Sequence, residues 1–300
     1  MKYAYYPGCA LHSSGSEFDI SLKAICSQLE LELEEVRGWI CCGSTPAHSV
    51  SELLALALPV ANLSLVEQMD EDEVVVPCAS CFRRLKAGQE AAAAETELAT
   101  EIHQVVGRRY RGSVQVSHPL EVFCAKEMLR QIAHQATADM SHLRVVCYYG
   151  CLLTRPPKLM QFDQHEYPMS MDDVLRAAGI RTLDWDFKTM CCGAALSLTE
   201  TDIVYKLTAD ILDEAQAVGA NAVAVACPLC HANLDTRQSE IEERKGKKYR
   251  LPVFYFTQLI GLAMGIASDE LGLEKHLVDT GELIRRRDEL PASEVAPATH

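Results

Sequence analysis

The sequence has no apolar run long enough to form a membrane-spanning helix. Such a helix needs ~20 consecutive, mostly apolar residues. The closest stretches are residues 53–66, which contain Pro59 and Asn62, and residues 252–268, which contain a glutamine. Residues 1–7 also lack the charged and apolar regions of a secretory signal. These absences predict a cytoplasmic protein without a direct membrane span, where disulfide bonds are uncommon.

Two common cofactor motifs are also missing. The chain has no Gly-x-Gly-x-x-Gly fingerprint of a dinucleotide-binding fold. It also lacks the closely spaced cysteine run of a ferredoxin domain. If the protein does redox chemistry, we therefore expect its electrons to arrive through partner subunits.

Basic residues are in the minority. There are 28 Lys and Arg against 42 Asp and Glu, which gives a net charge of -14. Nucleic-acid binding depends mainly on cationic contacts to phosphate, so we expect no nucleic-acid partner. The acidic residues are scattered along the chain, as is usual for a solvated surface.

Cysteine, in contrast, is plentiful and ordered. Ten of the 13 cysteines form two sets of five with the same pattern, which is Cys, then Cys-Cys-Gly, then Cys-x-x-Cys. The first set is Cys9, Cys41, Cys42, Cys78 and Cys81, and the second set is Cys151, Cys191, Cys192, Cys227 and Cys230. This internal repeat predicts two domains, residues 1–140 and 141–270, followed by a tail at 271–300.

Apolar β-branched runs alternate with helical patterns in both halves, which predicts an α/β fold with parallel strands. We expect strands at 2–6, 33–36, 73–76, 114–117, 143–148, 181–184, 222–226 and 253–256. We expect helices at 16–31, 52–69, 82–94, 98–106, 120–133, 171–178, 201–218, 231–244 and 258–266. Each half would then be a small parallel sheet flanked by helices. Ligands in such sheets bind beyond the carboxyl ends of the strands, and there each set of cysteines would converge.

Groups of four thiolates bind zinc or iron–sulfur clusters. Five cysteines per half is one more than an ordinary site needs. Either one cysteine is spare, or the inorganic core is opened out and one thiolate bridges two metal atoms. The adjacent pair Cys41-Cys42 fits the second idea, because neighbouring side chains splay apart and reach different metal atoms more easily than one.

The repeated Cys-Cys-Gly pattern resembles the CCG domain, and the whole chain is similar to the B subunit of heterodisulfide reductase. The matching segments are Tyr6-Pro7-Gly8-Cys9, Cys41-Cys42-Gly43, Pro77-Cys78-Ala79-Ser80-Cys81, Tyr149-Gly150-Cys151, Cys191-Cys192-Gly193-Ala194, Cys227-Pro228-Leu229-Cys230 and residues 252–259. Together they cover both repeats, to about residue 265.

This resemblance implies two pseudo-symmetric CCG repeats, each holding one noncubane [4Fe–4S] cluster on its five cysteines. It also implies that the two clusters flank a disulfide, such as the coenzyme M–coenzyme B heterodisulfide, and reduce it to two thiols. The implied partners are an iron–sulfur C subunit and an A subunit that carries flavin and iron–sulfur clusters. No catalytic residue beyond the cluster ligands is implied.

Two other functions stay open. CCG repeats also occur in electron-transfer subunits of quinone-linked dehydrogenases, which lack disulfide chemistry. Alternatively, one or both cysteine sets bind zinc in a structural module.

The remaining reactive residues have plainer interpretations. We expect Cys26 and Cys124 in helices of the core, and Cys147 as a buried spare thiol or an extra ligand. Arg155 and Lys158 are expected as surface cations, with contact to an anionic substrate as the alternative. A local hydrogen bond or a solvent-facing ring is expected for the three histidines that follow near the first set, His12, His48 and His118.

Overall fold

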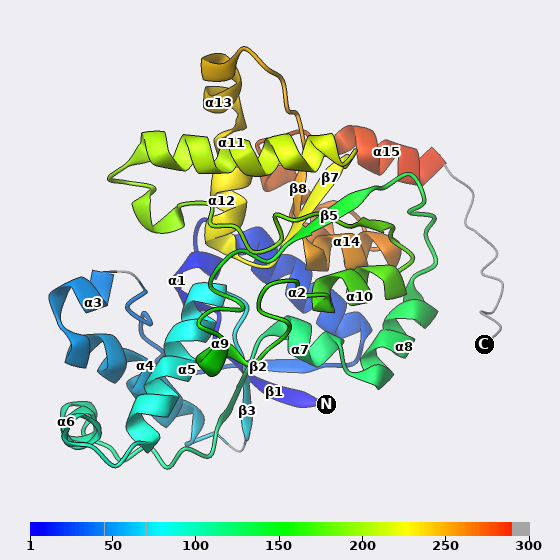
Figure 1. The fold of residues 1–300 in the computed structure, drawn as a ribbon. Coiled ribbons are helices and arrows are strands. Elements are labelled where there is room, and N and C mark those ends of the chain that lie inside the picture. The colour runs from blue at the N-terminus through cyan, green and yellow to red at the C-terminus, as the bar shows by residue number, and fades with distance from the viewer. Residues whose placement is uncertain (45, 70, 290–300) are drawn as a thin grey trace.

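Two four-stranded parallel sheets organise the chain (Figure 1). The computed structural model describes residues 1–44, 46–69 and 71–289. The first sheet has the order β2-β1-β3-β4 and the second has the order β6-β5-β7-β8. The strands are β1 Lys2–Tyr5, β2 Glu32–Glu35, β3 Glu73–Val75, β4 Gln115–Ser117, β5 Val145–Tyr148, β6 Thr182–Leu183, β7 Ala222–Val225 and β8 Val253–Tyr255. The two sheets confirm the predicted α/β class and the repeat.

Helices connect the strands and flank both sheets. In the first half they are α1 Gly8–Leu11, α2 Ser16–Gln28, α3 Pro46–Val50, α4 Glu52–Val66, α5 Ala79–Ala93, α6 Glu97–Val106, α7 Pro119–Phe123 and α8 Lys126–Gln135. In the second half they are α9 Pro157–Met160, α10 Ser170–Ala177, η1 Ala194–Leu196, α11 Thr201–Ala217, α12 Pro228–Thr236, α13 Gln238–Lys245, α14 Phe256–Ala263, η2 Asp269–Leu271, η3 Leu273–Lys275 and α15 Gly281–Glu289. Every helix in the described ranges is too short or too polar to cross a bilayer.

The position of a strand in its sheet matches its sequence. The inner strands β5 and β7 are buried at every residue, as expected for apolar runs in a sheet covered on both faces. Strand β2 has the sequence Glu-Leu-Glu-Glu and forms an edge of the first sheet. Charged side chains on an edge strand discourage pairing with another chain.

Two predicted helices are each broken into two. The predicted helix 120–133 ends at Cys124, and Ala125 leaves the helical region with ψ at 135° before α8 begins. The predicted helix 231–244 is interrupted at Arg237. The Arg237 guanidinium bonds to Ser197 O, and its Nε donates to Asn233 Oδ1. Hydrophobic periodicity continues across both breaks, so it does not reveal them.

The two halves share a core. Helix α14 of the second half packs against α2 of the first (Figure 1). The rings of Phe18 and Tyr255 stack with centroids 4.4 Å apart. Close by, the buried hydroxyls of Ser21 and Thr257 are 2.7 Å apart. These contacts fix the two cysteine-bearing sheets relative to one another.

The first part of the predicted tail is folded. Residues 271–289 contain η3 and α15, and Leu271 and Leu273 are buried. The last residues of that tail, 290–300, lie outside the described part of the chain.

Candidate metal centres

The cysteines of both sets lie where strands end and helices begin. In the first half, Cys9 follows β1, and Cys78 is the N-cap of α5 directly after β3. In the second half, Cys151 follows β5, and Cys227 is the N-cap of α12 directly after β7. Because the strands are parallel, these ends meet at one edge of each sheet.

Within each set, sulfur atoms from distant segments come together. Cys41 Sγ lies 4.0 Å from Cys9 Sγ, and Cys42 Sγ lies 3.2 Å from Cys81 Sγ. In the second set, Cys192 Sγ lies 3.7 Å from Cys230 Sγ, and the thiols of Cys151 and Cys191 interact. All thirteen cysteines are free thiols. Each half therefore presents grouped thiols, the donor type of iron–sulfur and zinc sites.

A glycine makes room for sulfur in each half. Gly8 and Gly150 precede the first cysteine of each set and have φ angles of +68° and +69°. A Cβ atom at Gly8 would lie 2.9 Å from Cys81 Sγ, and one at Gly150 would lie 2.9 Å from Cys230 Sγ. Any other residue would therefore displace a ligand-type sulfur as well as strain the backbone. We call Gly8 and Gly150 the cradle glycines. Because both halves have the same arrangement of glycine and sulfur, they fit the same kind of bound group.

The two sets meet at their innermost cysteines. The side chains of Cys78 and Cys227 interact across the boundary between the halves. The buried His118 ring holds the same boundary, since its Nε2 is 2.9 Å from Pro77 O and 3.3 Å from Ala226 O. Those carbonyls directly precede Cys78 and Cys227 in the chain. These bonds join segments far apart in the sequence and connect the two halves. The local hydrogen bond expected of His118 is the one that its Nδ1 accepts from Leu120 N at 3.2 Å.

Contacts among the thiols favour ionisation of particular sulfurs. Hydrogen bonds from the Cys41 and Cys81 thiols lower the pKa of Cys42 to about 3. A hydrogen bond from Cys151 lowers the pKa of Cys191 to about 6. The thiolate is the form that binds metal, so each set contains a sulfur prepared for that role.

A cavity of about 270 Å³ opens beside the second set. Cys151, Cys191, Cys192, Cys227 and Cys230 line it. The opposite wall comes from the first half and consists of Ser44, His48, Ala79, Ser80, Arg83 and Arg84. The cavity therefore lies between the two repeats and not within one of them.

Sequence reasoning missed the two arginines of this wall. Arg83 and Arg84 follow Cys81 and Phe82 in the first turns of α5. A residue three positions after another lies on the same helix face, so the pair Cys81 and Arg84 was the available signal. The expected alternative sites for an anion, Arg155 and Lys158, do not line the cavity. Arg155 instead pairs with Glu166 at 2.9 Å.

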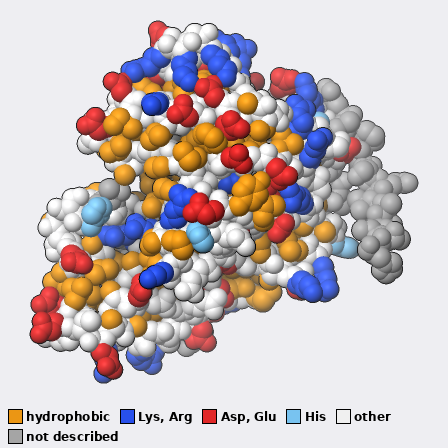
Figure 2. All heavy atoms as spheres, viewed as in Figure 1, with side chains coloured by type: hydrophobic (Ala, Val, Ile, Leu, Met, Phe, Trp, Pro, Cys, Tyr) orange, Lys and Arg blue, Asp and Glu red, His pale blue; other side chains and the backbone are white. Residues whose placement is uncertain are grey.

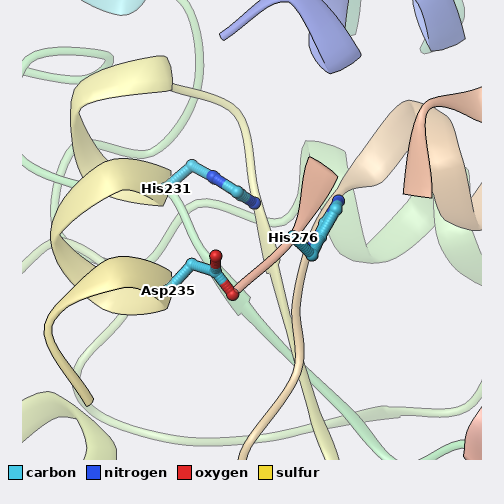
Figure 3. Close-up of side chains that lie close together, drawn as sticks. All are labelled: His231, Asp235 and His276. Carbon is cyan, nitrogen blue, oxygen red and sulfur yellow. The ribbon is translucent and has the colours of Figure 1, made fainter. Parts of the chain in front are cut away.

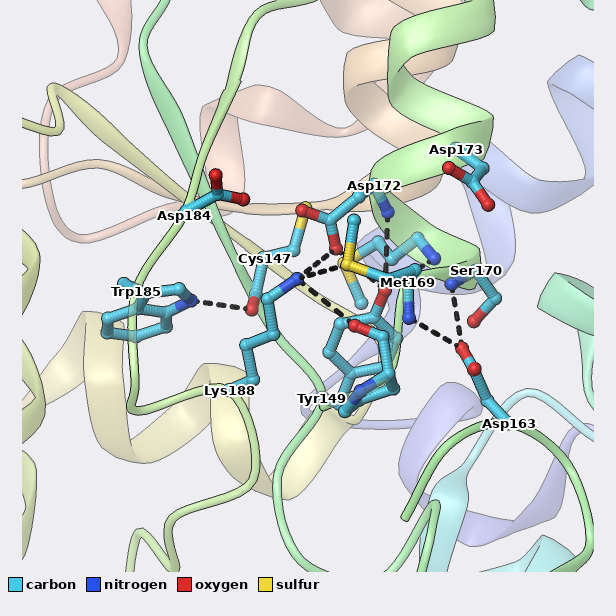
Figure 4. A network of polar contacts seen from close by, with 12 residues as sticks. Cys147, Tyr149, Asp163, Met169, Ser170, Asp172, Asp173, Asp184, Trp185 and Lys188 are labelled. Atoms are coloured by element: carbon cyan, nitrogen blue, oxygen red, sulfur yellow. Dashed lines mark hydrogen bonds and ion pairs between the residues drawn. The ribbon is translucent and has the colours of Figure 1, made fainter. Parts of the chain in front are cut away.

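A buried ion pair supports the loop that leads to Cys151. Lys188 Nζ lies 2.7 Å from Asp172 Oδ2, and both side chains are fully buried (Figure 4). The Tyr149 hydroxyl donates to the same carboxylate oxygen at 2.9 Å. The Lys188 carbonyl accepts hydrogen bonds from Tyr149 N and Gly150 N. Lys188 therefore fixes both the ring and the backbone of the segment before Cys151.

The three cysteines outside the two sets lie elsewhere. Cys147 is fully buried beside Asp172 (Figure 4). Its backbone carbonyl accepts a hydrogen bond from Trp185 Nε1. Cys26 lies within α2, as expected, whereas Cys124 is the C-cap of α7 and not an interior helix residue. Burial raises the pKa of Cys26 to about 12.

A further group of ligand-type side chains lies behind the second set. His231, Asp235 and His276 present atoms within 4.8 Å of one another (Figure 3). Most of their polar atoms already have protein partners: His231 Nε2 bonds Val253 O at 3.0 Å, and His276 Nε2 accepts from the Gln258 amide at 2.8 Å. His276 Nδ1 is buried without a partner among the described residues. Asp235 accepts the backbone N–H groups of residues 277 and 278. We interpret this group as a hydrogen-bonded link between α12 and the C-terminal segment.

Comparison with known proteins agrees with this architecture. The family model of the CCG cysteine-rich domain matches residues 3–86 and 145–235. The 8-methylmenaquinol:fumarate reductase membrane anchor subunit of Wolinella succinogenes is 30% identical over 94% of this chain and 99% of its own length. The B subunit of the ferredoxin:CoB-CoM heterodisulfide reductase of Methanosarcina mazei is 28% identical over 97% of this chain and 98% of its own.

One solved structure has the same fold over most of the chain. It is a hypothetical protein from Helicobacter pylori, with a TM-score of 0.75 at 11% sequence identity. The match covers 94% of this chain and 52% of that one. Both matched family segments contain one complete cysteine set, and the chain therefore belongs to the CCG cysteine-rich domain family.

Proposed function

We propose that the protein is the disulfide-reducing iron–sulfur subunit of a heterodisulfide reductase-type complex. In this proposal, each cysteine set holds one noncubane [4Fe–4S] cluster, and a small-molecule disulfide binds between the two. The ligands are Cys9, Cys41, Cys42, Cys78 and Cys81 for one cluster and Cys151, Cys191, Cys192, Cys227 and Cys230 for the other. The similarity to the B subunit of a heterodisulfide reductase over nearly the whole chain supports this assignment.

The observation that carries the proposal is the meeting of the two sets. Cys78 and Cys227 lie close enough for their thiols to interact, and the cavity has second-set cysteines on one wall and first-half residues on the other. Cleavage follows R–S–S–R′ + 2e⁻ + 2H⁺ → R–SH + R′–SH, so one site must deliver an electron pair. When bound, iron–sulfur clusters supply electrons singly, and two adjacent clusters match the two sulfurs of the substrate.

The chain's own residues prepare the site. Gly8 and Gly150 leave space for the sulfurs of Cys81 and Cys230. His118 holds the backbone before both inner cysteines. Among the described residues, most of the cavity lining is apolar or sulfur-bearing, including Leu152 and Leu229. Such a lining limits water near the reacting sulfurs and strengthens electrostatic interactions there.

Electrons must come from outside the chain, because it has no ferredoxin run and no dinucleotide fingerprint. We propose partner subunits of the C type, with iron–sulfur clusters, and of the A type, with flavin and iron–sulfur clusters. Three outer cysteines, Cys9, Cys41 and Cys191, are exposed and offer short routes for electron entry. A cytoplasmic location is part of the same proposal.

The test is an anaerobic assay with reduced methyl viologen as donor. We expect viologen oxidation that depends on an added disulfide and forms two thiols for each two electrons. Disulfide-independent oxidation, or none at all in protein with full iron content, would refute the proposed reaction. The complex with its partners should be assayed as well, because isolated subunits can lose their physiological donor.

A second candidate function rests on one comparison. The Wolinella succinogenes relative, at 30% identity, is named as a membrane anchor subunit of an 8-methylmenaquinol:fumarate reductase. Under this alternative, the chain transfers electrons from a quinol and reduces no disulfide. Reduction of the oxidised protein by a menaquinol analogue, without oxidation of the reduced protein by disulfides, would favour this alternative.

A further inference from the structure

The charged side chains that line the cavity are positive. Arg83 and Arg84 are its two permanently charged residues, and no Asp or Glu lines it among the described residues. This is unusual for a chain with 42 acidic and 28 basic residues. His48 adds a third basic group, and it is exposed at the rim.

The two guanidinium groups lack partners within the described part of the chain. Arg83 Nε and Arg84 Nε and Nη2 are buried, and none has a hydrogen-bond acceptor there. Neither side chain forms an ion pair with a described carboxylate. A buried donor without an acceptor costs about 1–3 kcal/mol, and more when the group is charged. A ligand with anionic oxygens would remove that cost.

The position of the pair is suited to a substrate. Arg84 lies one turn after Cys81 on α5 and is close enough to Cys42 and Arg83 for electrostatic interaction. The same cavity exposes the sulfurs of the second set across from it. Ser44 and Ser80, whose hydroxyls are 2.9 Å apart, add polar groups to the arginine wall. In Figure 2, Lys or Arg side chains are visible in the narrower region between helices α3 to α6, at the lower left, and helices α11 to α13, at the top.

We propose that Arg83 and Arg84 form a subsite for an anionic group of the substrate, a carboxylate, phosphate or sulfonate close to the disulfide. This inference rests on the proposed function and narrows its substrate class. Arginine is suited to this task because its planar group donates two parallel hydrogen bonds to such oxygens.

The test compares a charged disulfide with an uncharged one of the same shape. Dithiodipropionate carries carboxylates, and its diamide does not. With reduced methyl viologen as donor, the native protein should use the dicarboxylate at a kcat/KM roughly tenfold or more above that for the diamide. Arg84→Gln and Arg83→Gln should each raise KM for the dicarboxylate by about tenfold and leave KM for the diamide unchanged.

Two further variants sharpen the comparison. Arg84→Lys keeps the charge but loses the paired hydrogen bonds, so it should restore part of the affinity. Lys86→Gln is the matched control, since Lys86 is a cation of the same helix outside the cavity lining and stacks over Phe82. It should leave both KM values unchanged.

An opposing explanation is that the arginines only offset the negative charge of the thiolates. Substitution would then shift the reduction potentials of the bound clusters and change both substrates alike, which would overturn the proposal. If no disulfide is reduced, the proposed function fails, and calorimetry still decides the subsite. Anaerobic protein should bind mercaptopropionate more tightly than mercaptopropionamide, and Arg84→Gln should abolish the difference. Equal binding of the two thiols would refute the subsite.

Discussion

Tyr6 and Tyr148 make the same hydrogen bond in the two halves of the molecule. The Tyr6 hydroxyl donates to Ile40 O at 2.8 Å, and the Tyr148 hydroxyl donates to Met190 O at 2.7 Å. Each carbonyl belongs to the residue just before a Cys-Cys pair. Each bond therefore ties the end of the first strand in its half to the loop that carries two of the five thiols.

The two tyrosines should differ in their contribution to stability. Ile40 O also accepts Asn62 Nδ2 at 3.0 Å, whereas within the described residues Met190 O has the tyrosine as its donor. Tyr148→Phe should lower the free energy of unfolding by about 1–3 kcal/mol because the part-buried Met190 carbonyl loses its donor. Tyr6→Phe should cost less, about 1 kcal/mol.

Urea unfolding of anaerobically prepared protein measures both changes. Tyr3→Phe is the control, because among the residues that the structure describes the hydroxyl of the half-buried Tyr3 has only the Met1 sulfur at 3.8 Å as its partner. A larger loss in Tyr6→Phe than in Tyr148→Phe would contradict the expected difference between the two loops.

Adding a methyl group at either cradle glycine should remove one cluster. In Gly8→Ala the new Cβ would lie 2.9 Å from Cys81 Sγ, and in Gly150→Ala it would lie 2.9 Å from Cys230 Sγ. Iron content after anaerobic purification should fall from about eight to about four per chain in each variant.

Gly38→Ala separates sulfur displacement from backbone strain. Gly38 has a φ angle of +75°, but a Cβ there would meet no atom within 4 Å. This variant should lose about 1 kcal/mol of stability and keep its iron. Full iron content in Gly8→Ala and Gly150→Ala would show that these sulfurs are not ligands.

Much of this arrangement follows from local sequence, and some of it does not. The inner strands and the glycine before the first cysteine of each set have clear local signals. The breaks at Ala125 and Arg237 have none, because apolar spacing continues through both. The contact between Cys78 and Cys227 depends on how one sheet packs against the other, which no local pattern encodes. The spacing of Cys81 and Arg84 places one arginine on the helix face of a thiol, but that it faces the second set depends on the same packing.

Removing one member of the buried ion pair of Lys188 and Asp172 should destabilise the fold more than removing both charges. Lys188→Met leaves a buried carboxylate without its cation and should cost about 3–5 kcal/mol in free energy of unfolding. Asp172→Asn combined with Lys188→Met removes both charges and should recover part of that loss. Urea unfolding tests this, and equal losses in the single and double variants would contradict the expected coupling.

His276 should make stability depend on pH. Burial lowers the pKa of His276 to about 4, against an ordinary value of 6.5. Between these values the unfolded chain binds the extra proton, so stability that is present above pH 6.5 is lost as pH falls towards 4.

The His276→Gln variant isolates this effect. On moving from about pH 7.5 to 5.5, the native protein should lose about 1 kcal/mol more free energy of unfolding than the variant. The buried His118 is present in both proteins and cancels in the comparison. Burial is the larger cause of the lowered pKa of His231 and His276 the second, so most of the contribution of His231 is also common to both proteins. An identical loss in the two proteins would show that His276 does not titrate in this range.

The most direct measurement is the iron, zinc and acid-labile sulfide content of anaerobically purified protein. Two [4Fe–4S] centres predict about eight irons and eight sulfides per chain. Replacing Cys78 and Cys81 together by serine should remove the first centre and leave about four of each. Zinc without sulfide in the native protein, or only four irons, would contradict a pair of iron–sulfur centres facing one substrate.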